Sequence, residues 1–113
     1  MACSDPAVLR ALTFSLEIEG YDVQICESAS ALLALQLPNR RACLVLDQHL
    51  LPLSGLETLC ILRQRDVRLP AVLITGRPHS WVQGAATAAG AILVEKPLFG
   101  DVFLVAIRDA LAA

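Results

Sequence analysis

The run of residues 42–46 (Ala-Cys-Leu-Val-Leu), followed directly by Asp47, constrains the fold more than any other stretch of this sequence. Its residues are uncharged and mostly apolar, and polar and apolar positions do not alternate. This pattern is typical of a β-strand that is buried on both faces. In an open parallel sheet, ligands bind at the carboxyl ends of the strands, where Asp47 stands. Asp47 is therefore a candidate ligand or nucleophile, although an aspartate also commonly begins a turn.

Two similar runs, Ala71–Thr75 and Ala91–Glu95, predict two more buried strands, and the alternating run Tyr21–Cys26 predicts a fourth strand with one less buried face. Segments with a helical spacing of apolar residues lie between and around them. The predicted helices are Ser4–Gly20, Ala29–Gln36, Leu56–Arg65, Trp81–Ala89 and Gly100–Leu111. Alternating strands and helices predict an α/β fold: a flavodoxin-like, doubly wound parallel sheet with helices on both faces.

The start of the sequence departs from this architecture. A doubly wound fold normally begins with a strand, but only Met1-Ala2-Cys3 precedes the first predicted helix. The first strand is therefore predicted to be missing or atypical. Each unpaired buried backbone group costs about 1–3 kcal/mol. We therefore expect the sheet to close up between the remaining strands, or two chains to pair their strand edges.

Composition narrows the class of protein. The length of 113 residues fits one domain, residues 1–113, and a hydrophobic share of 56% provides a core and apolar surface for a partner. The net charge of −2 gives no electrostatic basis for nucleic-acid binding. No apolar run approaches the roughly 18–20 residues of a membrane span, and no signal-peptide pattern is present. The scattered cysteines predict free thiols in a reducing cytoplasm: Cys3, Cys26, Cys43 and Cys60.

Three polar residues end the three apolar runs: Asp47, Thr75 and Lys96. Each one alone has a structural explanation, since a threonine often ends a strand and a lysine is usually solvated. Parallel strands end at one edge of a sheet, so the three side chains are expected to meet there. An aspartate can form an aspartyl phosphate, while a lysine ammonium and a threonine hydroxyl can donate to phosphoryl oxygens. Together they predict phosphoryl transfer to Asp47.

With these residues the chain resembles a CheY-like receiver domain of a response regulator in two-component signalling. The resemblance also rests on Gly55, eight residues after Asp47, and on the segments Asp5–Arg10, Glu19–Val23, Leu73–Gly76 and Glu95–Pro97. It implies that Asp47 is the phosphoacceptor, Thr75 the switch hydroxyl and Lys96 the phosphate-contacting lysine. It also implies a histidine kinase as the phosphoryl donor, and an effector domain or downstream protein that is not in this chain.

The same resemblance implies Mg²⁺, which the family holds with a pair of acidic residues after the first strand. The matching positions are Cys3 and Ser4, and neither offers the hard anionic oxygen that Mg²⁺ prefers. Asp5 falls one residue late, where it suits a helix cap. The remaining predicted ligands are Asp47, the backbone carbonyl near His49 and Asp5. Mg²⁺ binding is therefore expected to be severely weakened.

Other departures leave alternatives open. Leu93 stands where the family usually has an aromatic residue, and Leu51 stands where it has a proline, with Pro52 one place later. The chain is either a shortened or mis-started receiver, or a degenerate receiver that acts as a phosphorylation-independent dimerisation or interaction module. In the second case the small-residue segment Gly84–Gly90 is a candidate contact face for a homodimer.

An enzyme is not expected. Haloacid-dehalogenase-type phosphatases also form an aspartyl phosphate, but they need a second aspartate two residues after the nucleophile. His49 occupies that position here. A nucleotide-binding module is not expected either, because the sequence has no Gly-x-Gly-x-x-Gly pattern and no P-loop.

Overall fold

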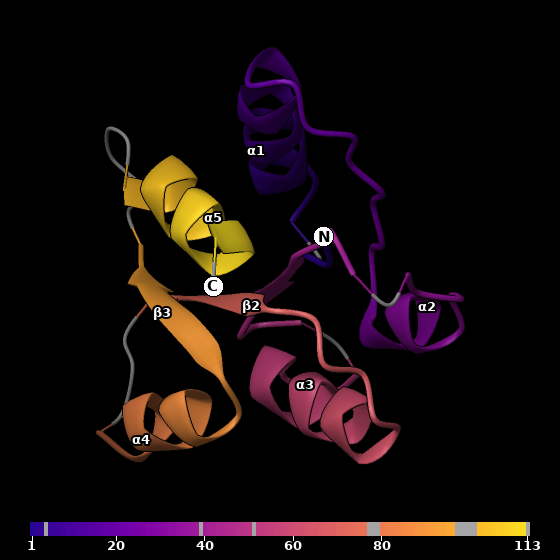
Figure 1. The fold of residues 1–113 in the computed structure, drawn as a ribbon, viewed down its shortest axis with the longest axis vertical. Coiled ribbons are helices and arrows are strands. Elements are labelled where there is room, and N and C mark those ends of the chain that lie inside the picture. Colours follow the sequence, from indigo (N-terminus) through magenta and orange to yellow (C-terminus); the bar gives the residue numbers. More distant parts are fainter. Residues whose placement is uncertain (4, 39, 51, 77–79, 97–101, 113) are drawn as a thin grey trace.

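The elements of the chain follow one another in the predicted order, except that no strand forms between the first two helices (Figure 1). The structure is a computed structural model, and it describes residues 1–3, 5–38, 40–50, 52–76, 80–96 and 102–112. The elements are α1 (Pro6–Ile18), α2 (Ala29–Leu33), β1 (Leu44–Asp47), α3 (Gly55–Gln64), β2 (Ala71–Thr75), α4 (Ser80–Ala88), β3 (Ala91–Glu95) and α5 (Val102–Ala112). None of the helices in these ranges is long and apolar enough to cross a membrane.

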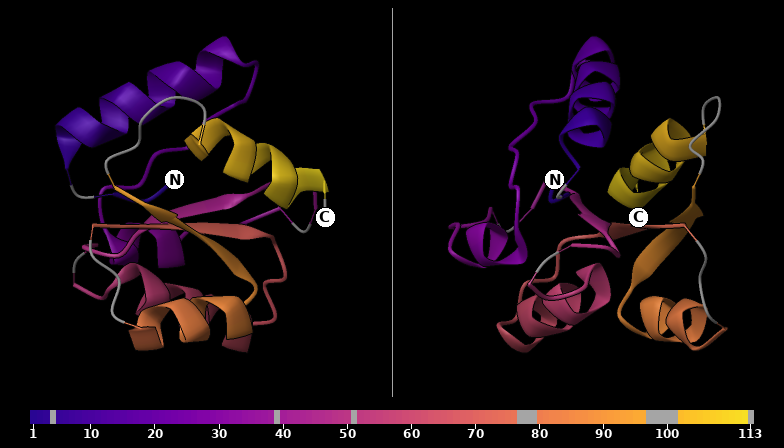
Figure 2. Two further views of the ribbon diagram at one scale, coloured as in Figure 1. Left: turned by 90° about the vertical axis from the view of Figure 1, so that its left-hand side faces the viewer. Right: turned by 180° about the vertical axis from the view of Figure 1, so that it is seen from behind.

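The named strands form a parallel sheet in the order β1-β2-β3, with helices on both faces. Helices α1 and α5 cover one face, and α2, α3 and α4 cover the other (Figures 1 and 2). Alternate residues of each strand point to opposite faces, so each face has its own apolar core. Leu46 and Leu73 belong to the core under α2–α4, while Val45, Val72 and Ile74 belong to the core under α1 and α5. The predicted fold class, a doubly wound α/β sheet, is confirmed.

Residues 1–3 take the place of the first strand. Ala2 forms parallel bridges to both Cys26 and Leu46. The Ala2 amide donates to the Val45 carbonyl at 2.8 Å, and the Asp47 amide donates to the Ala2 carbonyl at 3.0 Å. The expectation that the sheet closes up between the remaining strands is therefore wrong, because this short segment lies between them. The pairing of strand edges between two chains stays a prediction.

The predicted strand Tyr21–Cys26 is also wrong. Only Cys26 forms a bridge, with its amide donating to the Met1 carbonyl at 2.8 Å, and the residues before it are irregular. The Met1 amino group also donates to the Gln24 carbonyl, at 2.7 Å, but one bridge and one such contact do not form the regular ladder of a strand. The alternation of polar and apolar residues over 21–25 is therefore not accompanied by strand pairing.

Most other boundaries lie within two residues of the predicted ones. Helix α2 is the exception, because it ends at Leu33 instead of Gln36. Its last turn tightens, since the Leu35 amide donates to the Leu32 carbonyl three residues earlier. The predicted first residue of the last helix, Gly100, lies outside the described residues.

Candidate functional site

Asp47, Thr75 and Lys96 lie at the carboxyl ends of three adjacent strands. Asp47 ends β1 and Thr75 ends β2, and both are almost completely buried, at 4% and 2% exposed. Lys96 follows the last residue of β3, and its amide donates to the Thr75 carbonyl at 2.7 Å. The register pairs Asp47 with Ile74, and Thr75 with Glu95. The parallel sheet therefore brings together residues that lie far apart in the sequence.

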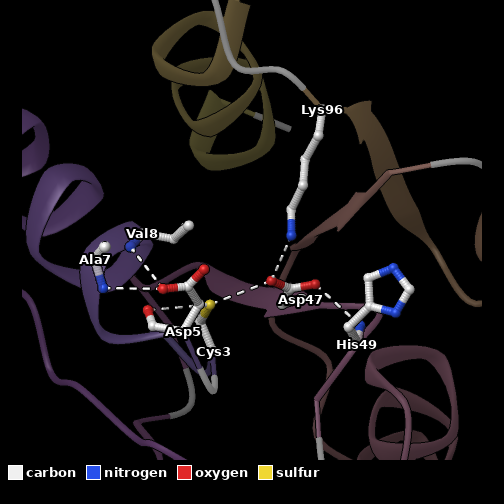
Figure 3. A network of polar contacts seen from close by, with 7 residues as sticks. All are labelled: Cys3, Asp5, Ala7, Val8, Asp47, His49 and Lys96. Atoms are coloured by element: carbon white, nitrogen blue, oxygen red, sulfur yellow. Dashed lines mark hydrogen bonds and ion pairs between the residues drawn. The ribbon is translucent and has the colours of Figure 1, made fainter.

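Donors from three segments contact the Asp47 carboxylate (Figure 3). Its Oδ2 accepts hydrogen bonds from Lys96 Nζ at 2.9 Å and from Cys3 Sγ at 3.2 Å. Its Oδ1 accepts a hydrogen bond from the His49 amide at 3.0 Å. Lys96 is the contact that the sequence predicted. Cys3 is a contact that it missed, although the sequence placed Cys3 where the family has an acid.

The hydrogen-bond donors around the Asp47 carboxylate keep it ionised. Burial alone would raise the pKa of the Asp47 carboxyl, but the Lys96 ammonium, the His49 amide and the Cys3 thiol outweigh burial and hold that pKa below its ordinary value. Burial raises the pKa of the Cys3 thiol, and the neighbouring Asp47 carboxylate raises it further. Cys3 is therefore a neutral thiol that donates a hydrogen bond to the ionised carboxylate.

Gln48, directly after β1, is tied to the start of helix α3. Gln48 Oε1 accepts a hydrogen bond from the Leu56 amide at 2.9 Å, and Ser54 and Glu57 form a reciprocal capping box. A Cβ atom on Gly55 would lie 2.6 Å from the Asp47 carbonyl oxygen and 2.8 Å from Leu73 Cδ1. Only glycine lets the first turn of α3 approach the end of β1 this closely.

Asp5 is engaged at the start of helix α1. Its Oδ1 accepts hydrogen bonds from the Ala7 amide at 3.0 Å and the Val8 amide at 3.5 Å, with Pro6 in the first turn (Figure 3). This is the N-cap arrangement that suits an aspartate at this position. Ser4, the second position that the resemblance matched to the acidic pair, lies outside the described residues. Leu51 lies outside them too.

An α/β domain with an acid ending β1, a hydroxyl ending β2 and a lysine following β3 has the architecture of a signal-receiving domain. The sequence matches the response regulator receiver domain family over residues 4–108. The chain belongs to this family, and the resemblance inferred from its motifs is confirmed. Domains of this family are generally signalling modules rather than enzymes.

Curated relatives support the same family. The chain is 34% identical over 104 residues to the transcriptional regulatory protein FixJ of Rhizobium meliloti. This alignment covers 91% of this chain and 51% of FixJ. It is 32% identical over 108 residues to the response regulator protein TodT of Pseudomonas putida, covering 95% of this chain and 48% of TodT. The chain thus spans about half the length of these relatives.

Solved structures agree with the fold. The FixJ-N crystal structure superposes with a TM-score of 0.85 at 32% identity, covering 96% of this chain and 88% of that one. A CheY-like receiver domain protein from Methanospirillum hungatei superposes with a TM-score of 0.86 at 25% identity, covering 98% of this chain and 90% of that one. Both structures share the receiver fold with this chain.

Receiver domains generally bind Mg²⁺, but the residues described here do not fit this ion. Mg²⁺ requires hard oxygen ligands in near-octahedral geometry and commonly takes carboxylates. Within residues 1–3, 5–38, 40–50, 52–76, 80–96 and 102–112, no group of three or more His, Cys, Asp or Glu side chains is placed to hold a metal. At the site itself, Asp47 has a lysine and a thiol as its side-chain neighbours. The predicted role of the His49 carbonyl as a ligand stays a prediction.

Proposed function

We propose that residues 1–113 form one signal-receiving domain of a two-component response regulator, in which Asp47 accepts a phosphoryl group from a histidine kinase. The observation that supports this most is the buried Asp47 carboxylate at the sheet edge, with Lys96 Nζ 2.9 Å from its Oδ2. The ion pair keeps the carboxylate ionised and therefore nucleophilic. A Cα radius of gyration of 12.7 Å supports the proposal of one domain, because a compact domain of this length is expected to have about 13 Å.

The proposed transfer is a substitution at phosphorus. One carboxylate oxygen of Asp47 attacks the phosphorus of a phosphohistidine on the kinase, and the P–N bond breaks with its electron pair left on the imidazole nitrogen. Asp47 becomes an acyl phosphate. The Lys96 ammonium then moves its contact from the carboxylate to the phosphoryl oxygens, which carry more negative charge.

Thr75 would report the arrival of the phosphoryl group. Its hydroxyl can donate to a phosphoryl oxygen, and this draws the end of β2 toward Asp47. The Lys96 amide donates a hydrogen bond to the Thr75 carbonyl, so β3 is coupled to that movement. We propose that the face formed by α4, β3 and α5 shifts between two states whose balance the phosphoryl group changes.

Partners and location follow from the same proposal. Because the relatives are about twice as long, we propose that an effector domain or a separate downstream protein receives the signal. The cysteines are all free thiols, so we place the domain in the cytoplasm, where they stay reduced.

Phosphotransfer onto the wild type and onto Asp47→Asn tests this proposal. Each protein is incubated with a phosphorylated histidine kinase or with phosphoramidate, and the phosphorylated form is separated on a phosphate-affinity gel. The wild type is expected to give a phosphorylated band, and Asp47→Asn is expected to give none. Equal labelling of both proteins would remove Asp47 from the reaction.

A second function is favoured by the crowding of the Asp47 carboxylate. Both oxygens already accept hydrogen bonds from the protein, and Lys96 already balances the charge. Such a domain can act as a phosphorylation-independent interaction module that forms a homodimer. In that case phosphoramidate would leave the amide NMR spectrum unchanged, and Asp47→Asn would self-associate as the wild type does.

A further inference from the structure

The position of Cys3 is fixed from both sides. Its amide donates to the Cys26 carbonyl at 3.1 Å, and the preceding residue, Ala2, pairs with β1 through Val45 and Asp47. Cys3 is only 2% exposed, and its Sγ lies 3.2 Å from Asp47 Oδ2. The same sulfur lies 3.9 Å from the Asp5 carbonyl oxygen. The backbone therefore holds position 3 so that the Cys3 side chain points at the Asp47 carboxylate.

The charges at this place already balance. Asp47 contributes one negative charge, Lys96 contributes one positive charge, and the Cys3 thiol that donates to Asp47 is neutral. A divalent cation entering here would meet a single carboxylate that is paired with an ammonium 2.9 Å away. Its approach would add repulsion from Lys96 without a second anion to offset it.

The ligand chemistry also disfavours the ion. Sulfur is a soft ligand, whereas Mg²⁺ takes carboxylate, carbonyl and water oxygens. Asp5, the acidic residue nearest to position 3 in the sequence, has one oxygen engaged with two amides of helix α1. Asp47 is thus the only acid whose carboxylate lies in the described contact network with Lys96 and Cys3.

We infer that the Asp47 site does not bind Mg²⁺ at cellular concentrations, and that the side chain at position 3 determines this. Lys96 and the Cys3 thiol together replace the metal as the groups that satisfy the carboxylate. A carboxylate placed at position 3 would point at the same spot and restore a two-carboxylate ligand set. Cys3→Asp is therefore expected to create an Mg²⁺ site. The inference takes Asp47 as the site of the proposed function, but Mg²⁺ binding can be measured without phosphorylation.

The test is a titration with MgCl₂ into the millimolar range at constant ionic strength, followed by the amide NMR signals of Asp47 and His49. Wild type, Cys3→Ser, Cys3→Asn and Cys3→Asp are compared. Cys3→Ser keeps a hydrogen-bond donor, and Cys3→Asn adds the shape of aspartate without its charge. The expected result is no saturable shift for the first three proteins and a saturable shift for Cys3→Asp. The dissociation constant of Cys3→Asp is expected to lie at least tenfold below the lower limit that the titration sets for the other three proteins.

Saturable shifts at Asp47 and His49 in the wild type would overturn the inference, and this arm does not depend on any variant folding. A folded Cys3→Asp protein without a saturable shift would also overturn it, because position 3 would then not be the determinant. Neither result bears on the phosphotransfer assay with Asp47→Asn. Likewise, an unlabelled wild type would end the proposed function and leave the Mg²⁺ result standing.

Discussion

Asp47 has different neighbours on its two sides, the strand ends and the amino-terminal segment, although Lys96 and Cys3 donate to the same carboxylate oxygen. On the side of β2 and β3, Thr75 ends β2 and Lys96 donates to Asp47, and we propose that both contact the phosphoryl group. On the amino-terminal side, Cys3 presents a neutral thiol, and Asp5 caps a helix. Under the proposed function, the groups that contact a phosphoryl group come from the strand ends, whereas the positions that the family uses for acidic metal ligands lie in the amino-terminal segment. One set can be present while the other is not.

The largest effect is expected from Gly55→Ala, which disturbs both sides at once. The added Cβ would lie 2.6 Å from the Asp47 carbonyl oxygen, so either β1 or the first turn of α3 must shift. Overpacking against backbone is expected to cost about 3 kcal/mol in the free energy of unfolding, measured with urea. Gly84→Ala is the matched control, because nothing lies within 4 Å of its Cβ, and it is expected to be neutral or stabilising. Equal losses for both variants would show that the close approach at Gly55 does not matter.

Lys96→Met tests the contact at the strand ends without changing Cys3 or Asp5. It leaves the Asp47 carboxylate, whose side chain is 5% exposed, without its cation. Removing one partner of a buried pair is strongly destabilising, and the partial exposure of Lys96 reduces this to about 2 kcal/mol. Arg68→Met removes a partner from the exposed Arg68–Asp66 pair at the same 2.9 Å and is expected to cost at most about 0.5 kcal/mol. The account of Lys96 fails if the two variants lose equal stability in urea.

Asp5→Ala probes the amino-terminal side. The loss of the N-cap is expected to cost about 1 kcal/mol in the free energy of unfolding. Asp5→Asn keeps a capping oxygen without the charge and is expected to recover most of this loss. A large loss in Asp5→Asn, measured by the same urea titration, would mean that the charge at Asp5 matters for more than the cap.

The smallest effect is the dependence on pH. The pKa of Asp47 is held below its ordinary value in the folded chain, so its ionised form contributes stability above the unfolded pKa of about 3.9. This contribution is lost as pH falls through the folded pKa. The difference in unfolding free energy between wild type and Asp47→Asn is therefore expected to shift against the wild type below about pH 4. A difference that stays constant down to acid pH would contradict the lowered pKa.

Much of this comparison could be predicted from the sequence. Strands Ala71–Thr75 and Ala91–Glu95 have the predicted bounds, because continuous apolar runs between helices have few alternatives in a parallel sheet. The meeting of Asp47 with Lys96 follows from the same topology. The segment Tyr21–Cys26 alternates between polar and apolar residues, and this pattern favours a strand with one buried face. The pattern does not show whether a neighbouring strand pairs with the segment.

The Cys3 contact could not be predicted from residue type, since a thiol usually serves as a small apolar side chain. It depends on residues 1–3 being held between Cys26 and β1, which only the three-dimensional pairing shows. The sequence did carry one signal, because Cys3 stands where the family has an acid.

Phosphotransfer from phosphoramidate, with Mg²⁺ or with EDTA, tests the central claim most directly: the phosphoryl-contacting side of Asp47 is present and the metal-binding side is not. The wild type is predicted to be phosphorylated slowly and at the same rate in both conditions, Asp47→Asn not at all, and Cys3→Asp faster only with Mg²⁺. A wild-type rate that rises with Mg²⁺ and falls with EDTA, or a label that persists in Asp47→Asn, would contradict the claim.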